Sequence, residues 1–328
     1  MVGMSRRLGV ARARPPSPPH TGNLATGAPR SERARRLLPI YALLLPGMLL
    51  YAVWAAFPLA QSFLMSFTDW RLRGESTFLG LDNYTRALAD PMFWKALWTT
   101  VGYTFVTVAG QLLLGLGAAL LLDQRFRGRG LLRLVYYLPV ITSWVIVSLI
   151  FVWLYNGQNG VLNWLLHDTL GVIDQDVAWL AEPSTAIWAI AVLGIWKGIG
   201  WSMVVFLAGL SSVPVELHEA AAMDGAGRWA RFRSVTLPFL RPTVTFLLIV
   251  LTIGGFSAFI SIFVMSSAAT GTIGGPLNST DVMLTYTWKQ AFAEIDLGYG
   301  AALSFLLALV IGAVSLVELR LVRREGVA

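Results

Sequence analysis

Long apolar segments, separated by short polar connections, make up most of the chain after its first 36 residues. A helix that crosses a bilayer needs about 20 apolar residues, because each residue advances it by about 1.5 Å. Six segments reach this length: residues 37–63, 97–122, 131–155, 186–210, 239–265 and 299–322. The pattern predicts an all-α membrane protein with six transmembrane helices.

The first 36 residues are basic and rich in proline instead. Their eight arginines and the segment Arg14-Pro15-Pro16-Ser17-Pro18-Pro19 cannot form a helix or bury a core. We expect residues 1–36 to be a disordered cytoplasmic tail. A signal peptide is the alternative, but the apolar segment that follows exceeds 20 residues and no small-x-small cleavage pattern is evident. Pro46 and Pro58 are expected to kink the first span, which membrane helices tolerate.

Composition and charge agree with a membrane location. The chain is 56% hydrophobic and only 13% charged, whereas a soluble domain of this length needs more charge to cover its surface. Nineteen of the 25 lysines and arginines lie in the N-terminal tail, the second and fourth connections and the C-terminal end. Because cytoplasmic segments carry the excess of basic residues, we predict that both termini are cytoplasmic. Basic residues dispersed between apolar segments also argue against a nucleic-acid partner.

Side chains that could perform chemistry are few and scattered. The chain has no cysteine, which excludes disulfides, thiolate metal sites and a cysteine nucleophile. Its histidines are His20, His167 and His218, one each in the tail, an outer and an inner connection. An outer acidic group is too irregularly spaced for a known metal loop; its members are Asp168, Asp174, Asp176 and Glu182. We expect no catalytic and no metal site, and a membrane-embedded transferase is the weaker alternative.

Two connections have their own helical pattern. Outside, residues 157–170 place four apolar side chains at helical spacing, typical of a short amphipathic helix lying at the membrane surface. Inside, residues 214–238 begin with Pro214 at a helix start and continue with strong helix formers. Gly225 then supplies a turn, and a second short helix is predicted from 228 to 236. This compact helical loop suits rigid coupling to a partner protein.

The inner loop resembles the EAA motif of binding-protein-dependent ABC importers. The matching positions are Glu219-Ala220-Ala221, Gly225, Val235 and Leu237-Pro238, with valine in the isoleucine position and Asp224 directly before the glycine. In that family the loop docks into a cleft of the ATPase. The resemblance implies the type I importer fold, a permease of a bacterial or archaeal inner membrane, and residues 97–322 as its transmembrane domain. Residues 37–96 would be the first helix and an outer segment, and 323–328 a C-terminal tail.

The same resemblance implies the partners. A permease of this kind works with a second homologous permease subunit, an ABC ATPase dimer and an extracytoplasmic solute-binding protein in the lipid bilayer. ATP and Mg²⁺ would belong to the ATPase, because this chain has no G-x-x-x-x-G-K-[ST] phosphate loop. We therefore expect a non-catalytic transport subunit without a cofactor. A stand-alone channel would leave the coupling motif without a purpose.

Shorter segments resemble sugar permeases of the maltose and glycerol-3-phosphate type. They are Gly80–Tyr84, Asp90–Trp94, Leu138-Pro139, Trp196-Lys197, Gly274-Gly275-Pro276 and Ser279-Thr280. The chain departs from the maltose permease in lacking a large outer domain, and the stretch 266–273 is longer than usual. This subgroup implies a sugar or sugar derivative as substrate, and a polyol phosphate or another small solute is the alternative.

Candidate pathway residues lie in spans four and five. Lys197 is a charged residue in the middle of a span, so it either faces a polar pathway or pairs structurally. In the maltose-type permease a W-x-G-x-x-Y stretch contacts sugar; here it reads Trp196, Gly198 and Trp201. Span five would add Phe256, Ser257 and Phe259, and simple helix packing is the alternative for these residues. Gln111 in span two is expected to form an interhelical hydrogen bond.

Overall fold

The computed structural model describes residues 30–70, 76–124 and 126–325, so most of the predicted tail lies outside the described residues. The chain divides into two units, residues 1–58 and 59–328. In the first unit, α1 (Arg30–Tyr51) begins inside the segment predicted as tail and passes Pro46 without a break. A π-helical stretch, Ala52–Ala56, then ends just before Pro58. Proline has no N–H to donate to the preceding turn, and a widened turn accommodates this loss.

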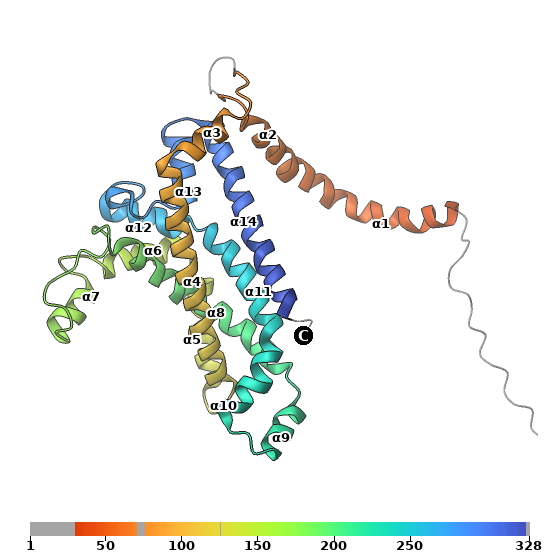
Figure 1. Cartoon of the computed structure of the whole chain (residues 1–328), viewed down its shortest axis with the longest axis vertical. Coiled ribbons are helices and arrows are strands. Elements are labelled where there is room, and N and C mark those ends of the chain that lie inside the picture. The colour runs from red at the N-terminus through yellow and green to blue at the C-terminus, as the bar shows by residue number, and fades with distance from the viewer. Residues whose placement is uncertain (1–29, 71–75, 125, 326–328) are drawn as a thin grey trace, which may run out of the picture. The chain divides into compact units, whose positions relative to one another are not determined.

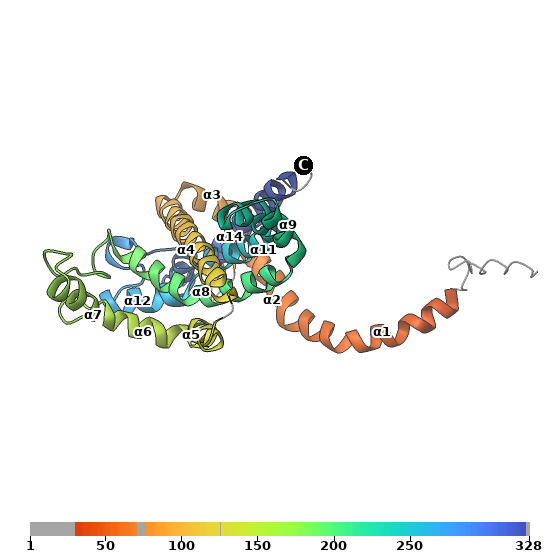
Figure 2. The ribbon, with the colours of Figure 1, turned by 90° about the horizontal axis from the view of Figure 1, so that it is seen from below.

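The second unit, which begins at residue 59 inside α2, is built from helices that differ greatly in length (Figure 1). They are α2 (Phe57–Met65), α3 (Asp82–Ala89), α4 (Pro91–Asp123), α5 (Arg129–Ile141), α6 (Trp144–Leu154), α7 (Val161–Asn163), α8 (Ala186–Ser211), α9 (Val215–Met223), α10 (Arg228–Arg231), α11 (Leu237–Phe256), α12 (Ile260–Thr270), α13 (Met283–Trp288) and α14 (Leu297–Glu325). Helices α4, α8 and α11 pack against one another, and α14 packs along α11. Helices α9 and α10 lie at the opposite end of α4 from α3 (Figure 1), and α9 is therefore in front when this unit is seen from below (Figure 2).

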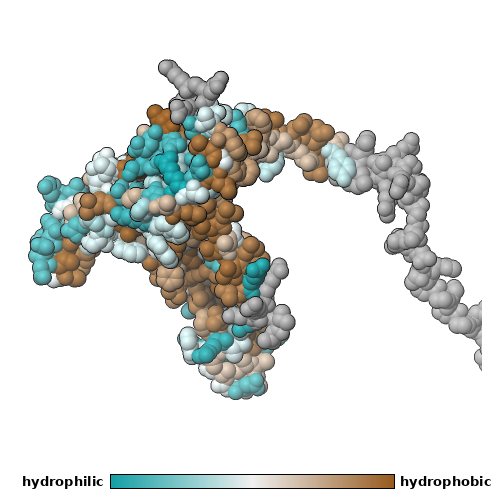
Figure 3. Space-filling model, turned by 45° about the horizontal axis from the view of Figure 1, so that its top comes forward, coloured by the Kyte–Doolittle hydropathy of each residue, from teal (hydrophilic) through white to brown (hydrophobic). Residues whose placement is uncertain are grey.

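Five stretches of the described chain are long and apolar enough to cross a membrane, and a sixth crossing arises if the bent pair α5–α6 forms one span. On the face shown in Figure 3, hydrophobic residues cover the middle of the long helices, and hydrophilic residues gather at their ends. The predicted all-α membrane architecture is therefore confirmed, whereas the orientation of the termini stays a prediction.

The third predicted span is a bent pair of helices and not one straight helix. Helix α5 ends at Ile141, α6 begins at Trp144, and the two are bent by 98°. Thr142 and Ser143 adopt extended backbone conformations between them, and Pro139 removes a hydrogen-bond donor from the last turn of α5. Span five is also interrupted, because residues 257–259 separate α11 from α12. In both places apolar composition continues across the break, so hydropathy alone indicates one long helix.

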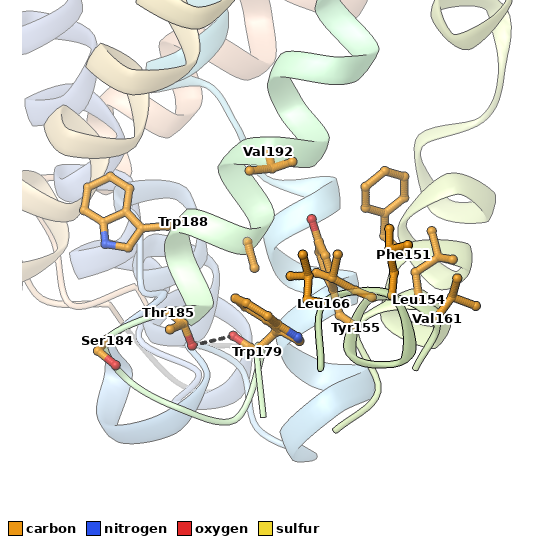
Figure 4. Close-up of a pocket in the computed structure, with 13 residues that line it drawn as sticks. Phe151, Leu154, Tyr155, Val161, Leu166, Trp179, Ser184, Thr185, Trp188 and Val192 are labelled. Carbon is orange, nitrogen blue, oxygen red and sulfur yellow. Dashed lines mark hydrogen bonds between the residues drawn. The ribbon is translucent and has the colours of Figure 1, made fainter. Parts of the chain in front are cut away.

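The outer connection between α6 and α8 contains the predicted short helix. Helix α7 continues into a π-helical stretch, Trp164–Thr169. Asn163 fixes it by donating to the carbonyls of Gly157 and Val177, each at 3.0 Å, and by accepting a 2.7 Å bond from the indole of Trp179. Its apolar side borders a pocket of about 600 Å³ against α6 and α8 (Figure 4). The amphipathic pattern thus marks a helix that packs onto the membrane domain.

Candidate functional site

Helix α9 ends in a glycine cap that places the motif residues. Gly225 has φ +79°, a left-handed conformation that other residues adopt only with strain. Its amide donates to the carbonyl of Ala222 at 3.0 Å, and the amide of Ala226 donates to Ala221 at 2.9 Å. These two bonds form a Schellman motif, which satisfies carbonyls at a helix end. The spacing between the alanines and the glycine of the motif is therefore the spacing of a helix and its cap.

The second half of the loop is continuous with span five. Helix α10 passes into a π-helical stretch, Phe232–Thr236, and then directly into α11, with Pro238 in its first turn. The predicted second helix therefore does not stop before the span, because the π-helical stretch tolerates a proline that lacks an N–H. Thr236 is buried at this junction, and Val235 is half-buried. Helix α10, the π-helical stretch and α11 thus form one uninterrupted helical segment.

The outward side of the loop is largely free of contacts within the chain. Met223 is 89% exposed and Trp229 is 71% exposed, and Glu219 and Ala220 are exposed beside them. The Trp229 ring stacks on Phe232 with centroids 5.5 Å apart, which fixes its direction. Such rigid exposed aromatic and apolar side chains are typical anchors of a protein interface.

A cavity of about 690 Å³ lies where α4, α8 and α11 meet the break in span five. Four of the seven predicted pathway residues line it: Gly198, Trp201, Ser257 and Phe259. The other three do not. Trp196 packs against Phe151 with ring centroids 5.5 Å apart, and Phe256 is buried in a cluster with Met283 and Leu303. Lys197 is 3% exposed and points to the α5–α6 break.

The cavity also contains residues that the sequence reasoning did not assign to it. Tyr103, Thr107 and Gln111 line it from α4, and Trp144 lines it from the start of α6. The three α4 residues are four positions apart, so a polar stripe on an otherwise apolar helix was the available signal. Trp144 gave no such signal, because its position depends on the break in span three. Gln111 donates to the carbonyl of Gly194 at 3.3 Å, as expected for an interhelical bond.

A polar network ties the start of α4 to α13 and to the start of α14. Asp90 caps α4 by accepting from the amide of Met92 at 2.8 Å, and it also accepts from the hydroxyls of Tyr286 and Tyr299. Burial alone would raise the pKa of the Asp90 carboxyl, but these hydrogen bonds hold its pKa below the ordinary value. Burial and the bond to Asp90 raise the pKa of Tyr286. The ionised Asp90 carboxylate therefore links the start of α4 to α13 and to the start of α14.

A second carboxyl, that of Asp281, is buried with fewer hydrogen bonds than that of Asp90. Asp281 is 0% exposed, accepts from the Thr285 hydroxyl at 3.1 Å, and lies 3.8 Å from the ammonium of Lys289. Its Oδ2 has no hydrogen-bond donor among the described protein groups. Burial raises the pKa of Asp281 despite the nearby lysine.

Apolar helices around a central cavity, with a rigid helical loop at one end, define a membrane transport subunit. Residues 111–325 match the family described as the inner membrane component of binding-protein-dependent transport systems, and the chain belongs to this family. It is a non-catalytic permease of the inner membrane, as predicted from the sequence.

Curated relatives support this assignment along nearly the whole chain. The sulfoquinovosyl glycerol transport system permease protein SmoG of Agrobacterium fabrum is 35% identical over 88% of this chain and 92% of its own length. The trehalose/maltose transport system permease protein MalF of Thermococcus litoralis is 34% identical over 86% and 93%. A bacterial alginate ABC transporter, solved in complex with an alginate pentasaccharide-bound periplasmic protein, contains a chain with a TM-score of 0.76 and 22% identity over 90% and 98%. That likeness shows the type I importer fold.

Proposed function

We propose that this chain is one of two permease subunits of an ABC importer for a sugar or sugar derivative. The observation that carries the proposal is the continuous path from the coupling loop to the cavity. Helix α10 joins α11 without a break, and α11 contributes Val250, Leu251, Gly254 and Gly255 to the cavity wall. A partner that moves the loop would therefore move one wall of the cavity.

The coupling role is assigned to the motif residues of the loop 214–238. Glu219 and Ala220 form the outward side of α9, and the amides of Gly225 and Ala226 close it by donating to the carbonyls of Ala222 and Ala221. Asp224 precedes the cap, and Val235, Leu237 and Pro238 form the junction with α11. We assign docking to the ATPase to the exposed first half and transmission to the second half.

The chemistry of the cavity supports a sugar as substrate. Its described lining combines hydroxyl and amide groups with the indoles of Trp144 and Trp201. Aromatic faces pack against the C–H surfaces of a sugar, and neutral polar groups bind its hydroxyls. None of the described residues that line the cavity is lysine or arginine, which disfavours a polyol phosphate. The transport systems of the two relatives named above handle sugar derivatives and disaccharides, by their names.

The proposed assembly has three further components: a second permease, an ATPase dimer that binds ATP and Mg²⁺, and an extracytoplasmic binding protein. The solved alginate transporter has a periplasmic protein bound, which supports the last of these. Both termini and the loop 214–238 would face the cytoplasm, as the charge asymmetry predicts.

Co-expression with the products of neighbouring genes tests the proposal. The purified complex is reconstituted into liposomes, and uptake of a panel of labelled sugars, amino acids and a polyol phosphate is measured with ATP inside. We expect uptake of a sugar that depends on the binding protein. A binding protein selective for an amino acid would refute the sugar assignment, and uptake without the ATPase would refute the coupling.

A further inference from the structure

Lys197 occupies an unusual position for a charged side chain. It lies on α8 within a predicted span and is 3% exposed. The ammonium donates to the carbonyl of Pro139 at 2.6 Å and to that of Thr142 at 2.7 Å. It also lies 3.5 Å from the carbonyl of Val140 and 4.8 Å from the centre of the Trp144 ring. No carboxylate of the described chain lies within ion-pair distance of it.

These carbonyls belong to the last turn of α5 and to the break that follows it. The last carbonyls of a helix lack amide donors, and they carry the negative end of the helix dipole. In a membrane such groups need an internal partner, because water is absent. At the end of α5 the ammonium of Lys197 provides three donors and a positive charge. The Pro139 carbonyl also accepts from the amide of Thr142 at 3.3 Å and from its hydroxyl at 2.6 Å, so the ammonium adds positive charge at this helix end and donates to the Thr142 carbonyl as well.

The backbone of α8 is shaped for this contact. Gly200 is one turn after Lys197, and a Cβ atom there would lie 2.1 Å from the carbonyl oxygen of Tyr136 on α5. Only glycine permits the two helices to come this close. Lys197 and Gly200 therefore both contact α5. Lys197 binds the carbonyls at its end, and Gly200 leaves room for its backbone to pack closely against α8.

We propose that Lys197 is a positioning residue that holds the break in span three and thereby holds Trp144 in the cavity wall. It acts on the substrate only through this geometry. The consequence for transport rests on the proposed importer function, whereas the consequence for the helix geometry does not. Of the two roles considered for Lys197 from the sequence, a polar pathway and structural pairing, the proposal takes the second and gives it an effect on the cavity.

The bend can be measured directly, because the chain has no cysteine to remove. Spin labels are placed at Leu134→Cys on α5 and Ile150→Cys on α6, both at exposed side chains. A continuous helix would separate their backbones by about 24 Å, and two arms at a right angle by about 17 Å. The distance is recorded in the purified full-length complex for the parent, Lys197→Met, Lys197→Gln and Lys197→Arg. Lys95→Met is the matched control, because Lys95 also donates to a carbonyl, that of Leu277.

We expect the Lys197→Met distance distribution to lengthen and broaden by several ångströms, with Lys197→Gln in between. Lys197→Arg should keep the parent distance, because it keeps a cationic donor, and Lys95→Met should keep it too. Fluorine NMR of 5-fluorotryptophan, assigned with Trp144→Phe, should show a shifted Trp144 signal in Lys197→Met and an unshifted Trp229 signal.

Uptake measured on the same samples separates the effect of Lys197 on helix geometry from its effect on transport. A bend and a Trp144 signal that do not change in Lys197→Met or Lys197→Gln would overturn the proposal, and a simultaneous loss of uptake would return Lys197 to the pathway. A changed bend in a complex that transports no sugar at all would support the proposal while refuting the proposed function.

Discussion

The amide of Ala226 donates a hydrogen bond to the carbonyl of Ala221 at 2.9 Å, across the left-handed Gly225. This bond joins the small-residue helix of the motif to its glycine, so the motif describes a geometry as well as a surface. The cap holds α9 in a fixed direction relative to α10 and α11. Coupling should therefore respond to the backbone freedom of residue 225.

Gly225→Ala is expected to weaken coupling through backbone strain. A Cβ at this position meets no other atom within 4 Å, so the cost of about 1–2 kcal/mol comes from the left-handed conformation alone. ATP-driven uptake should fall severalfold. Gly225→Asn should retain more activity, because asparagine tolerates this conformation better. Gly227→Ala is the control: its added Cβ also meets no atom, and its φ is −65°. Equal losses in Gly225→Ala and Gly227→Ala would contradict the role of the cap.

Gly198→Ala should change the cavity. A Cβ atom there would lie 2.0 Å from the Gln111 side-chain oxygen, so the glutamine must move and its 3.3 Å bond to Gly194 must break. Uptake should fall and the selectivity among sugars should change, whereas the variant should still assemble with the ATPase. Gly254 lines the same cavity, but a Cβ atom added there meets no atom within 4 Å. The variant Gly254→Ala should therefore transport nearly normally. Altered transport only in Gly254→Ala would show that the glutamine position is unimportant.

Asp281→Asn should stabilise the protein at neutral pH. The pKa of Asp281 is raised, so the folded chain binds a proton more tightly than the unfolded chain does. Stability therefore falls as pH rises from the ordinary aspartate pKa through the raised value, and the cost persists above it. Asparagine keeps an acceptor for Thr285 and removes the buried charge. The variant should have a higher Tm at pH 7 and a smaller difference between its Tm values at pH 4 and pH 7. A lower Tm at pH 7 would mean that the Lys289 pair outweighs burial.

Asp90→Ala should destabilise the contact of α4 with α13 and the start of α14. The substitution removes the cap of α4, which costs about 1 kcal/mol, and leaves the hydroxyls of Tyr286 and Tyr299 without their acceptor. We expect a lower Tm and faster hydrogen exchange in α13. Asp82→Ala, at the first residue of α3, is the comparison, because its side chain accepts none of these bonds. An unchanged Tm in Asp90→Ala would show that the network contributes little.

Much of the fold follows from hydropathy, because the lengths of α4, α8 and α14 are set by the membrane thickness that they must cross. The cap at Gly225 was also predictable, since a glycine directly after a run of helix formers marks a helix end. The break at Thr142 and Ser143 was not. Its residues are neither strong breakers nor charged, and the break is held by Lys197, which lies more than 50 residues later in the chain. For the same reason the position of Trp144 in the cavity wall could not be predicted from the sequence.

The central claim is that the loop 214–238 couples a separate ATPase to sugar movement through this chain. ATP-dependent uptake by the reconstituted complex, compared with that of a complex carrying a bulky residue in place of Gly225, tests it most directly. The account predicts that the parent accumulates a sugar only with ATP, the ATPase and the binding protein present, and that the variant is severely impaired. Assembly and uptake at the full rate in the variant would contradict it.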